Sequence, residues 1–439
     1  MLKVCKFGGT SMADAKAIKQ VADIINADKD RRYVVVSAPG KRFKEDIKVT
    51  DLLIKCYNDV LRNGECKETF SVIRDRFIGI VKDLGIDFDI NSVLDETEKE
   101  IVENSSLDFS ASRGEYLMAR VFAAYMNVPF VDAKGLIRFD SKGRLNESYT
   151  YDKTKMKLEG LEMAVIPGFY GKNSQGNIKT FSRGGSDITG SLIARAMGAD
   201  IYENWTDVNG FLVCDPRVVA NPKVIKFLSY QELRELSYMG ASVLHSEAIF
   251  PLVKSKIPVN IRNTFDPSQE GTMIVPNDYY ANVKPDIITG IAGLKDFTVI
   301  YIEKSLMNEE VGFVRKVLSV IEQHGICFEN IPSGIDTISI VIASKALENG
   351  VLNDVVSEIR ESVSPDFIRV IENISLIATV GHGMATKAGV AAKLFNALAK
   401  ENINIKMIDQ GSSELNIIIG VSNTDYEKSI KAIYNEFID

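Results

Sequence analysis

The last ~150 residues contain an internal repeat, which restricts the fold more than any other feature of the sequence. Gly312 and Gly389 lie 77 positions apart (389 − 312), and at the same spacing Lys316 matches Lys393. Each copy is predicted as strand, helix, strand, strand, helix, and the alternating run at 338–342 is typical of a half-buried antiparallel strand. With one further strand, each copy would be a βαββαβ, ferredoxin-like unit.

The second copy ends after its second helix and therefore lacks its fourth strand. We expect Asp286–Leu294, upstream of the first copy, to supply that strand. The first copy would then be inserted within the second, which predicts repeat domains at 297–373 and at 285–296 with 374–439. Aligned without a gap, the repeat matches Glu329 with Lys406 and matches one apolar strand with another: Ile338, Ile340 and Ile342 with Leu415, Ile417 and Ile419.

The first ~284 residues form the other predicted domain, in which short apolar runs alternate with segments of helical periodicity. Helices are expected near 112–127 and 186–197, and strands at Leu2–Phe7, Tyr33–Ser37, Val128–Asp132, Met163–Ile166 and Ile201–Asn204. This alternation predicts an α/β fold, a three-layer α/β/α domain with a mostly parallel sheet. In such sheets ligands bind at the carboxyl ends of strands, where the unusual loops of this sequence fall.

Composition and charge narrow the range of functions. The formal net charge of -7 gives no support for a nucleic-acid partner, although a local basic pocket can still bind ATP. No apolar run approaches the ~20 residues that span a bilayer. Five scattered cysteines without a CxxC pair indicate reduced thiols and a cytoplasmic protein. The three histidines show no metal-ligand spacing, so we expect no metal site built from them.

Two glycine-rich loops open predicted helices. KFGGTS, at Lys6–Ser11, follows the first strand, and its glycines let the backbone approach a ligand while the helix start offers N–H groups to an anion. Lys6 can hold a phosphate as a point charge, but it precedes the glycines, so this is not a P-loop. FSRGGSD, at Phe181–Asp187, adds an arginine fork for an anionic substrate and places Asp187 as a partner for Lys6. Capped turns without a ligand are the alternative for both loops.

Three further segments are ambiguous when each is taken alone. SRGE at Ser112–Glu115 offers a carboxylate for a substrate ammonium, or only a capped helix start with an acidic first turn. WTDVNG at Trp205–Gly210, followed by Cys214–Arg217, carries an aspartate after a strand, or forms only a surface hairpin. Ser37–Lys41 and the nearby Lys48–Asp51 form a fifth candidate, or only a flexible basic loop.

In this combination and order, KFGGTS, SRGE, FSRGGSD and WTDVNG resemble the motifs of aspartate kinases of the amino-acid kinase superfamily. The C-terminal repeat resembles that family's paired ACT domains, and the resemblance to the lysine-sensitive, monofunctional type covers the whole chain. It implies transfer of the γ-phosphoryl group of ATP, with Mg²⁺, to the β-carboxylate of L-aspartate, the first step of lysine, threonine and methionine biosynthesis. A carboxylate with a pKa near ~3.9 is already ionised at neutral pH, so this chemistry needs charge stabilisation rather than a general base.

The resemblance also implies roles for individual residues. Lys6 would stabilise the phosphoryl oxygens and Asp187 would orient it, while Arg183 would clamp a carboxylate of aspartate and Glu115 would receive its ammonium. The implied substrate site comprises Thr50, Glu115, Arg183, Gly184, Gly185 and Ser186. The implied nucleotide site comprises Gly8, Gly9, Thr10, Thr206, Asp207, Leu212 and Arg217. The metal ion is expected to be carried by ATP.

Regulation through the repeats is a further implication. An amino-acid effector, lysine and/or threonine, would bind where two ACT units meet, and the chain would form homodimers or homotetramers through them. The implied effector site comprises Met307, Gly312, Phe313, Val314, Cys327, Phe328 and Glu329. Because Lys406 matches Glu329, we expect the first repeat alone to receive the effector's ammonium.

One departure from the family and two alternative functions remain. Ser242 stands where many members have a lysine that helps hold the nucleotide, and Arg217 or Lys41 could supply that charge. Another carboxylate kinase, such as a glutamate kinase, is disfavoured by WTDVNG and by the twin repeat. A non-catalytic amino-acid sensor is disfavoured by the intact Lys6, Arg183 and Asp187.

Overall fold

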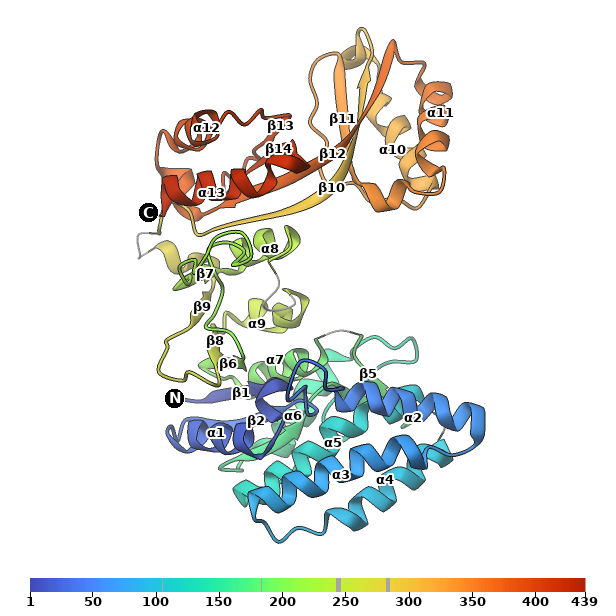
Figure 1. The fold of residues 1–439 in the computed structure, drawn as a ribbon, viewed down its shortest axis with the longest axis vertical. Helices are drawn as coiled ribbons and strands as arrows, with labels where there is room; N and C mark the ends of the chain where they lie inside the picture. The colour runs from blue at the N-terminus through green and yellow to red at the C-terminus, as the bar shows by residue number, and fades with distance from the viewer. Residues whose placement is uncertain (105, 183, 242–245, 282–284, 439) are drawn as a thin grey trace. The chain divides into compact units, whose positions relative to one another are not determined.

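The computed structural model describes residues 1–104, 106–182, 184–241, 246–281 and 285–438. Contacts divide the chain into two units (Figure 1). The first unit comprises Met1–Phe211, Val224–Tyr230 and Ser242–Tyr279, and the second comprises Leu212–Lys223, Gln231–Ala241 and Tyr280–Asp439. Two short segments from the middle of the chain, 212–223 and 231–241, therefore group with the C-terminal residues.

A seven-stranded sheet forms the centre of the first unit, in the order β3-β2-β1-β6-β8-β9-β7. Its strands are β1 (Lys3–Phe7), β2 (Arg31–Val36), β3 (Ala164–Pro167), β6 (Ile201–Thr206), β7 (Phe227–Ser229), β8 (Val259–Asn263) and β9 (Thr272–Val275). Neighbours from β3 to β8 are parallel, and β9 runs antiparallel to β8. The mostly parallel α/β sheet is therefore confirmed. A separate hairpin joins β4 (Tyr170–Lys172) and β5 (Ile178–Thr180).

The prediction of a strand at Val128–Asp132 is wrong. Only one bridge joins this segment to the sheet, between Phe130 and Val165 of β3. The Val165 amide donates to the Pro129 carbonyl and the Val131 amide donates to the Val165 carbonyl, but Pro129 has no N–H that could extend the pairing. The pairing therefore stops after a single residue.

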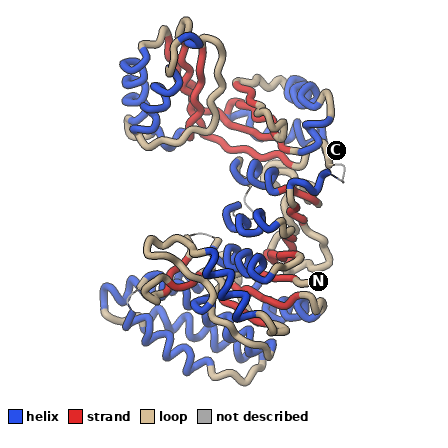
Figure 2. Tube along the Cα trace, turned by 180° about the vertical axis from the view of Figure 1, so that it is seen from behind, coloured by secondary structure: helices blue, strands red, loops and turns tan. Residues whose placement is uncertain are grey.

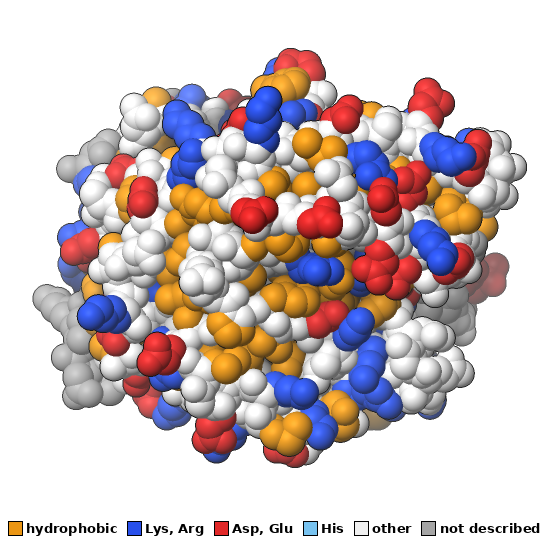
Figure 3. Space-filling model, turned by 90° about the horizontal axis from the view of Figure 1, so that it is seen from below, with side chains coloured by type: hydrophobic (Ala, Val, Ile, Leu, Met, Phe, Trp, Pro, Cys, Tyr) orange, Lys and Arg blue, Asp and Glu red, His pale blue; other side chains and the backbone are white. Residues whose placement is uncertain are grey.

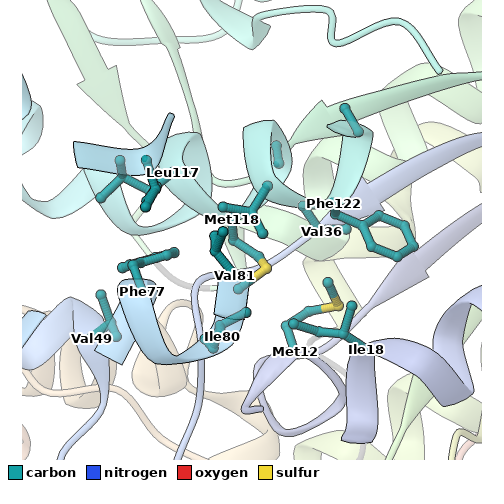
Figure 4. Packing of buried hydrophobic residues seen from close by; sticks show 14 of the residues in the cluster. Met12, Ile18, Val36, Val49, Phe77, Ile80, Val81, Leu117, Met118 and Phe122 are labelled. Atoms are coloured by element: carbon teal, nitrogen blue, oxygen red, sulfur yellow. The ribbon is translucent and has the colours of Figure 1, made fainter. Parts of the chain in front are cut away.

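Helices lie on both sides of the strands (Figures 1 and 2). They are α1 (Ala15–Asn26), α2 (Val49–Asn63), α3 (Lys67–Leu84), α4 (Ile90–Asn104), α5 (Leu107–Met126), α6 (Glu147–Leu158), α7 (Gly185–Met197) and α9 (Phe250–Ser255), with a 3₁₀ turn η1 (Thr10–Met12) before α1. Alternate residues of β1 face opposite layers. Cys5 and Phe7 pack into a core with α1, α3 and α5, whereas Lys6 between them points to α7 (Figure 4 shows this core).

The second unit contains a five-stranded antiparallel sheet in the order β11-β10-β12-β14-β13. Its strands are β10 (Gly290–Glu303), β11 (Thr337–Ala343), β12 (Phe367–Val380), β13 (Met407–Asp409) and β14 (Asn416–Ser422). Its helices are α8 (Tyr230–Tyr238), α10 (Phe313–Gln323), α11 (Val351–Val363), α12 (Val390–Lys400) and α13 (Tyr426–Phe437). The first residue of α8, Tyr230, is grouped with the first unit. Strand order and helix placement match two ferredoxin-like units.

The two ferredoxin-like units share their long strands. Gly290–Leu294, the start of β10, pairs with the end of β12, and the rest of β10 pairs with the start of β12. Each long strand is therefore the first strand of one repeat and the fourth strand of the other. The strand expected from the upstream segment is confirmed, although it begins at Gly290 rather than at Asp286.

The register between the repeats corrects the ungapped alignment. The Glu329 amide donates to the Val341 carbonyl, and the Lys406 amide donates to the Gly420 carbonyl, so the match of Glu329 with Lys406 holds. The partners Val341 and Gly420 are 79 positions apart, however, so the second repeat carries two extra residues in the turn before β14. The second strand of the first repeat is reduced, next to β11, to isolated bridges at Asn330 and Ser333.

Charged side chains of both signs surround a central group of hydrophobic side chains on the face shown in Figure 3. None of the described helices is long and apolar enough to cross a membrane.

Candidate active site

An ion pair on the face of the sheet that points to α7 joins the two residues predicted to be catalytic. Lys6 Nζ lies 2.6 Å from Asp187 Oδ1, and Asn204 Nδ2 donates to the same oxygen at 2.9 Å. Lys6 comes from β1, Asn204 from the neighbouring β6 and Asp187 from the first turn of α7. Only 8% of Lys6 is exposed, so its ammonium is held in one place close to the helix start. Asn204 was not predicted, although it lies opposite Lys6 in the parallel register.

The glycine turn after β1 continues the ladder towards β6. The Gly8 amide donates to the Trp205 carbonyl at 3.0 Å, and Thr10 Oγ1 donates to Asp207 Oδ2 at 3.1 Å. The Thr206 hydroxyl contacts the other oxygen of Asp207 at 3.3 Å. The structure thus brings together five residues predicted for the nucleotide site: Gly8, Gly9, Thr10, Thr206 and Asp207.

The loop after β2 packs directly on this turn. The Gly40 amide donates to the Gly9 carbonyl at 2.7 Å, and a Cβ on Gly40 would come within 2.6 Å of the Gly9 carbonyl carbon. The two backbones therefore touch without intervening side chains, which only glycine allows here. The exposed Lys41 that follows has its Nζ 3.2 Å from the Lys44 carbonyl.

The start of α7 is shaped by two glycines. Gly184 has φ 59°, a left-handed conformation that favours glycine, and a Cβ on Gly185 would come within 2.5 Å of Phe169. Ser186 is buried and packs against Gly168 after β3. The helix thus directs its first N–H groups to the carboxyl edge of the sheet, as an anion site requires. Arg183, predicted to clamp a substrate carboxylate, lies outside the described residues.

Glu115 is a buried carboxyl with an incomplete set of partners. It lies on α5, only 5% is exposed, and its Oε2 has no hydrogen-bond partner. Burial raises the pKa of Glu115 to about 8, against the lowering effects of a backbone hydrogen bond from Ala38 and of the Arg113 charge. A Cβ on Gly114 would lie 2.6 Å from Ala38 Cβ, so this part of α5 packs against the loop that touches Gly9. Such a group suits a cationic ligand, which would supply the missing partner.

The remaining SRGE residues have a structural role. Arg113 is buried among the rings of Phe109, Tyr116 and Tyr170, with its guanidinium carbon 4.4 Å from the nearest ring centre. The Ser112 hydroxyl accepts hydrogen bonds from the same guanidinium. Thr50, predicted to contact the substrate, is half-buried in the first turn of α2.

Two residues predicted for the nucleotide site belong to the second unit. Leu212 begins the segment 212–223, and Arg217 lies within it. The Arg217 side chain is mostly exposed, and its guanidinium is paired with Asp215 at 2.6 Å. Ser242, the predicted departure from the family's motifs, lies outside the described residues.

The predicted effector residues lie near both ends of α10 in the second unit: Met307, Gly312, Phe313 and Val314 at its start, and Cys327, Phe328 and Glu329 after its end. Gly312 caps the helix with φ 83°, Met307 and Phe313 are buried, and Val314 is exposed. Cys327 and Phe328 are also exposed, and the next residue, Glu329, is half-buried. Glu329 faces Tyr238 at the end of α8, and burial together with this carboxylate raises the pKa of the phenol to about 12. The contact with Tyr238 had no signal in the sequence.

Comparisons with known proteins identify the family. Residues 1–263 match the model of the amino acid kinase family, and residues 377–437 match an ACT domain. Aspartokinase 3 of Bacillus subtilis (strain 168) is 38% identical over 452 residues, which span 99% of this chain and 98% of the relative. The chain belongs to the aspartokinases.

Solved aspartokinase structures agree with the fold. The Clostridium acetobutylicum aspartate kinase is 50% identical with a TM-score of 0.91, and the comparison covers 99% of both chains. E. coli aspartokinase III in complex with aspartate and ADP is 25% identical with a TM-score of 0.76, covering all of both chains. The same E. coli enzyme with lysine and aspartate gives 26% and 0.74 with the same coverage. The chain thus has the architecture of these aspartokinases, with a kinase unit and a pair of ACT repeats.

Proposed function

We propose that the chain catalyses transfer of the γ-phosphoryl group of ATP to the β-carboxylate of L-aspartate, giving 4-phospho-L-aspartate and ADP. The observation that carries this proposal is the pair of Lys6 and Asp187 between the glycine turn after β1 and the glycine-rich start of α7. A buried ammonium there offers a fixed positive charge to an anion, and the start of α7 offers free N–H groups. The arrangement suits a reaction in which two anions must approach each other.

Each step follows from charge rather than from proton transfer. The aspartate carboxylate is the nucleophile and is already ionised at neutral pH, since its pKa lies near ~3.9. One of its oxygens attacks the γ-phosphorus while the bond to the β,γ-bridging oxygen breaks, and ADP leaves with the electron pair. We propose that Lys6 stabilises the charge spread over the transferred group and that Asp187 holds Lys6 in position.

Substrate orientation is assigned to residues around this pair. Glu115 supplies a carboxylate for the aspartate ammonium, Arg183 a fork for a carboxylate, and Gly184, Gly185 and Ser186 the backbone of the helix start. Thr50 adds a hydroxyl. The nucleotide is assigned to Gly8, Gly9, Thr10, Thr206 and Asp207.

Mg²⁺ belongs to the proposed reaction as part of the ATP substrate. Among the described residues, no group of three or more His, Cys, Asp or Glu side chains is arranged to hold a metal ion. Phosphate oxygens and water are preferred Mg²⁺ ligands, so the ion can arrive on the nucleotide and neutralise its charge there.

The test is ADP release from Mg·ATP with L-aspartate, with L-glutamate and with no acceptor. We expect release with aspartate only, and trapping with hydroxylamine should recover the acyl phosphate as a hydroxamate. Equal release with glutamate would indicate a broader carboxylate kinase. Release independent of any acceptor, or none at all, would refute the proposal.

We also propose that the ACT repeats bind an amino-acid effector, with lysine as the first candidate. The lysine complex of E. coli aspartokinase III supports this choice. The proposed domains are 1–284 for catalysis, 297–373 for the first repeat, and 285–296 with 374–439 for the second, with assembly into homodimers or homotetramers through the repeats. Inhibition by lysine, by threonine and by both tests the effector, and light scattering tests the assembly.

A further inference from the structure

A buried arginine outside every motif of the kinase unit contacts the back of the glycine turns. Arg76 lies in the middle of α3, and only 7% of it is exposed. Its Nη2 donates to the Ala13 carbonyl at 3.2 Å and to the Gly40 carbonyl, and its Nη1 donates to the Ile47 carbonyl at 3.0 Å. One guanidinium therefore binds three separate places in the backbone.

These three carbonyls belong to the segments that form the proposed phosphate site. Ala13 ends the turn that begins with Gly8 and Gly9. Gly40 lies in the loop after β2, and its own amide donates to the Gly9 carbonyl. Ile47 lies at the far end of the same loop, two residues before α2 begins. Arg76 thus ties the turn after β1 to both ends of the loop after β2.

A carboxylate in the loop strengthens this attachment. Asp46 is buried and lies 3.5 Å from Arg76 Nη1, while its two oxygens accept hydrogen bonds from the Arg42 guanidinium at 2.8 and 2.9 Å. The hydrogen bonds from Arg42 hold the pKa of Asp46 well below its usual range. Asp46 is therefore charged throughout the neutral range and offsets part of the cost of burying Arg76.

The helix that carries Arg76 is itself fixed. The adjacent Phe77 is fully buried, and Ile80 and Val81 on the next turn pack in the same core as Met12 of the glycine turn (Figure 4). A planar guanidinium with five N–H donors can satisfy several carbonyls at once, whereas an ammonium cannot reproduce that fork. Because peptide groups are trans and planar, holding the Gly40 carbonyl towards α3 turns the Lys41 N–H away from it.

We propose that Arg76 is a positioning residue for phosphoryl transfer. It holds the turn of Gly8 and Gly9 against the loop 37–48, so that the phosphate site is formed before the nucleotide binds. The proposal rests on the proposed assignment of Gly8–Thr10 to the nucleotide phosphates. Misplacing reacting groups by about 1 Å can cost on the order of 10²-fold in rate, so loss of this attachment is expected to be measurable.

The experiment compares Arg76→Met and Arg76→Lys with Arg74→Met. Arg74 lies on the same helix but pairs with Asp95 and Glu98 of α4, so Arg74→Met controls for the loss of an arginine from α3. We expect Arg76→Met to lower kcat/KM for ATP by about 10–100-fold. Arg76→Lys should lower it by less, and Arg74→Met should stay within about twofold of the wild type. The thermal midpoint of each variant shows whether it is folded at the assay temperature.

Two readouts do not depend on turnover. Trp205 is the single tryptophan, lies directly before Thr206 and stacks on Phe7, so its fluorescence can report ADP binding. Lys41, Arg42 and Lys44 are exposed in the loop, so trypsin reports its release. We expect weaker ADP binding and faster cleavage at 41–44 in Arg76→Met, a smaller change of the same kind in Arg76→Lys, and no change in Arg74→Met.

The outcomes separate the two proposals. If the wild type releases no ADP with aspartate, the proposed reaction fails, while cleavage and ADP binding still test the attachment. If folded Arg76→Met or Arg76→Lys binds ADP as Arg74→Met does and is cut no faster, Arg76 is not a positioning residue. A lowered thermal midpoint with unchanged KM for ATP would likewise overturn the proposal, since it indicates a purely structural role.

Discussion

The catalytic and regulatory units present their candidate site residues in opposite ways. Lys6, Glu115 and Ser186 are almost fully buried and are held by neighbouring strands, helices and loops of the same unit. Around the proposed effector site, Val311 is 97% exposed and Val314 and Phe328 are also exposed. A site for phosphoryl transfer must be rigid before the reaction starts, whereas the effector site proposed above, where two ACT units meet, would keep part of its surface open in one chain.

The largest expected effect tests the rigid site. Lys6→Ala should lower kcat on the order of 10²–10³-fold, because it removes a fixed charge that acts on the transferred group. Steady-state kinetics with Mg·ATP and aspartate measure the loss. Lys16→Ala, an exposed lysine on α1, is the matched control and should remain near wild type. If Lys6→Ala keeps more than about a tenth of the wild-type kcat, the assigned role is wrong.

Glu115, in the rigid catalytic site, should make kcat/KM for aspartate depend on pH. Its folded-state pKa of about 8 lies well above the ordinary pKa of a glutamate carboxyl. The free enzyme therefore holds this carboxyl mostly protonated at neutral pH, and binding of the aspartate ammonium requires it ionised. We expect kcat/KM for aspartate to rise with pH up to about 8, and Glu115→Gln to lower it and to remove this dependence. An unchanged pH profile in the variant would exclude Glu115 from the ammonium site.

The same raised pKa predicts a stability effect in the absence of ligands. Between the unfolded and folded pKa values, the unfolded state binds fewer protons than the folded state, so stability falls as pH rises. Glu115→Gln has no such carboxyl to ionise. Its free energy of unfolding relative to wild type should therefore increase between pH 5 and 8, by on the order of 4 kcal/mol at most. Urea unfolding at several pH values measures the difference, and a constant difference would show that Glu115 ionises normally.

The smallest effect on catalysis is expected in the regulatory unit. Glu329→Ala should weaken inhibition by lysine about tenfold or more and leave the uninhibited kcat nearly unchanged, because a hydrogen bond to a charged group is lost outside the catalytic unit. Lys406→Ala changes the equivalent position of the second repeat, and it should leave inhibition unaffected. Equal effects of the two variants would mean that the repeats do not differ in the predicted way.

The sequence predicted the fold best where local patterns carry the information. The strands at Leu2–Phe7, Tyr33–Ser37, Met163–Ile166 and Ile201–Asn204 all correspond to observed strands within two residues at each end. Their β-branched residues and the glycines after them encode strand and turn directly. The repeat was found because glycines mark the start of α10 and α12.

What the sequence did not predict depends on contacts distant in the chain. The two extra residues before β14 became visible only through the pairing of Glu329 and Lys406 with their partner strands. The grouping of 231–241 with the repeats follows from side chains, such as that of Glu235, which accepts from Asn416 at 2.7 Å. No local pattern records such partners.

Arg76 is a different case, because a signal was present. Ile73, Arg76 and Ile80 lie on one face of α3, and both isoleucines are buried. A charge on an apolar helix face must find buried partners or destabilise the fold. Its position in this pattern predicts a buried polar contact, although only the structure shows that the partners are carbonyls of two loops.

The sharing of β10 and β12 between the repeats has a consequence during synthesis. Leu294 pairs with Leu376, which the ribosome adds 82 residues later. At about 5–20 residues per second, the start of β10 waits roughly 4–16 s for its partner strand. In that interval an apolar strand edge is open to other nascent chains, and crowded expression favours aggregation. Slower initiation or lower temperature should therefore improve the soluble yield more for this chain than for a kinase unit made alone.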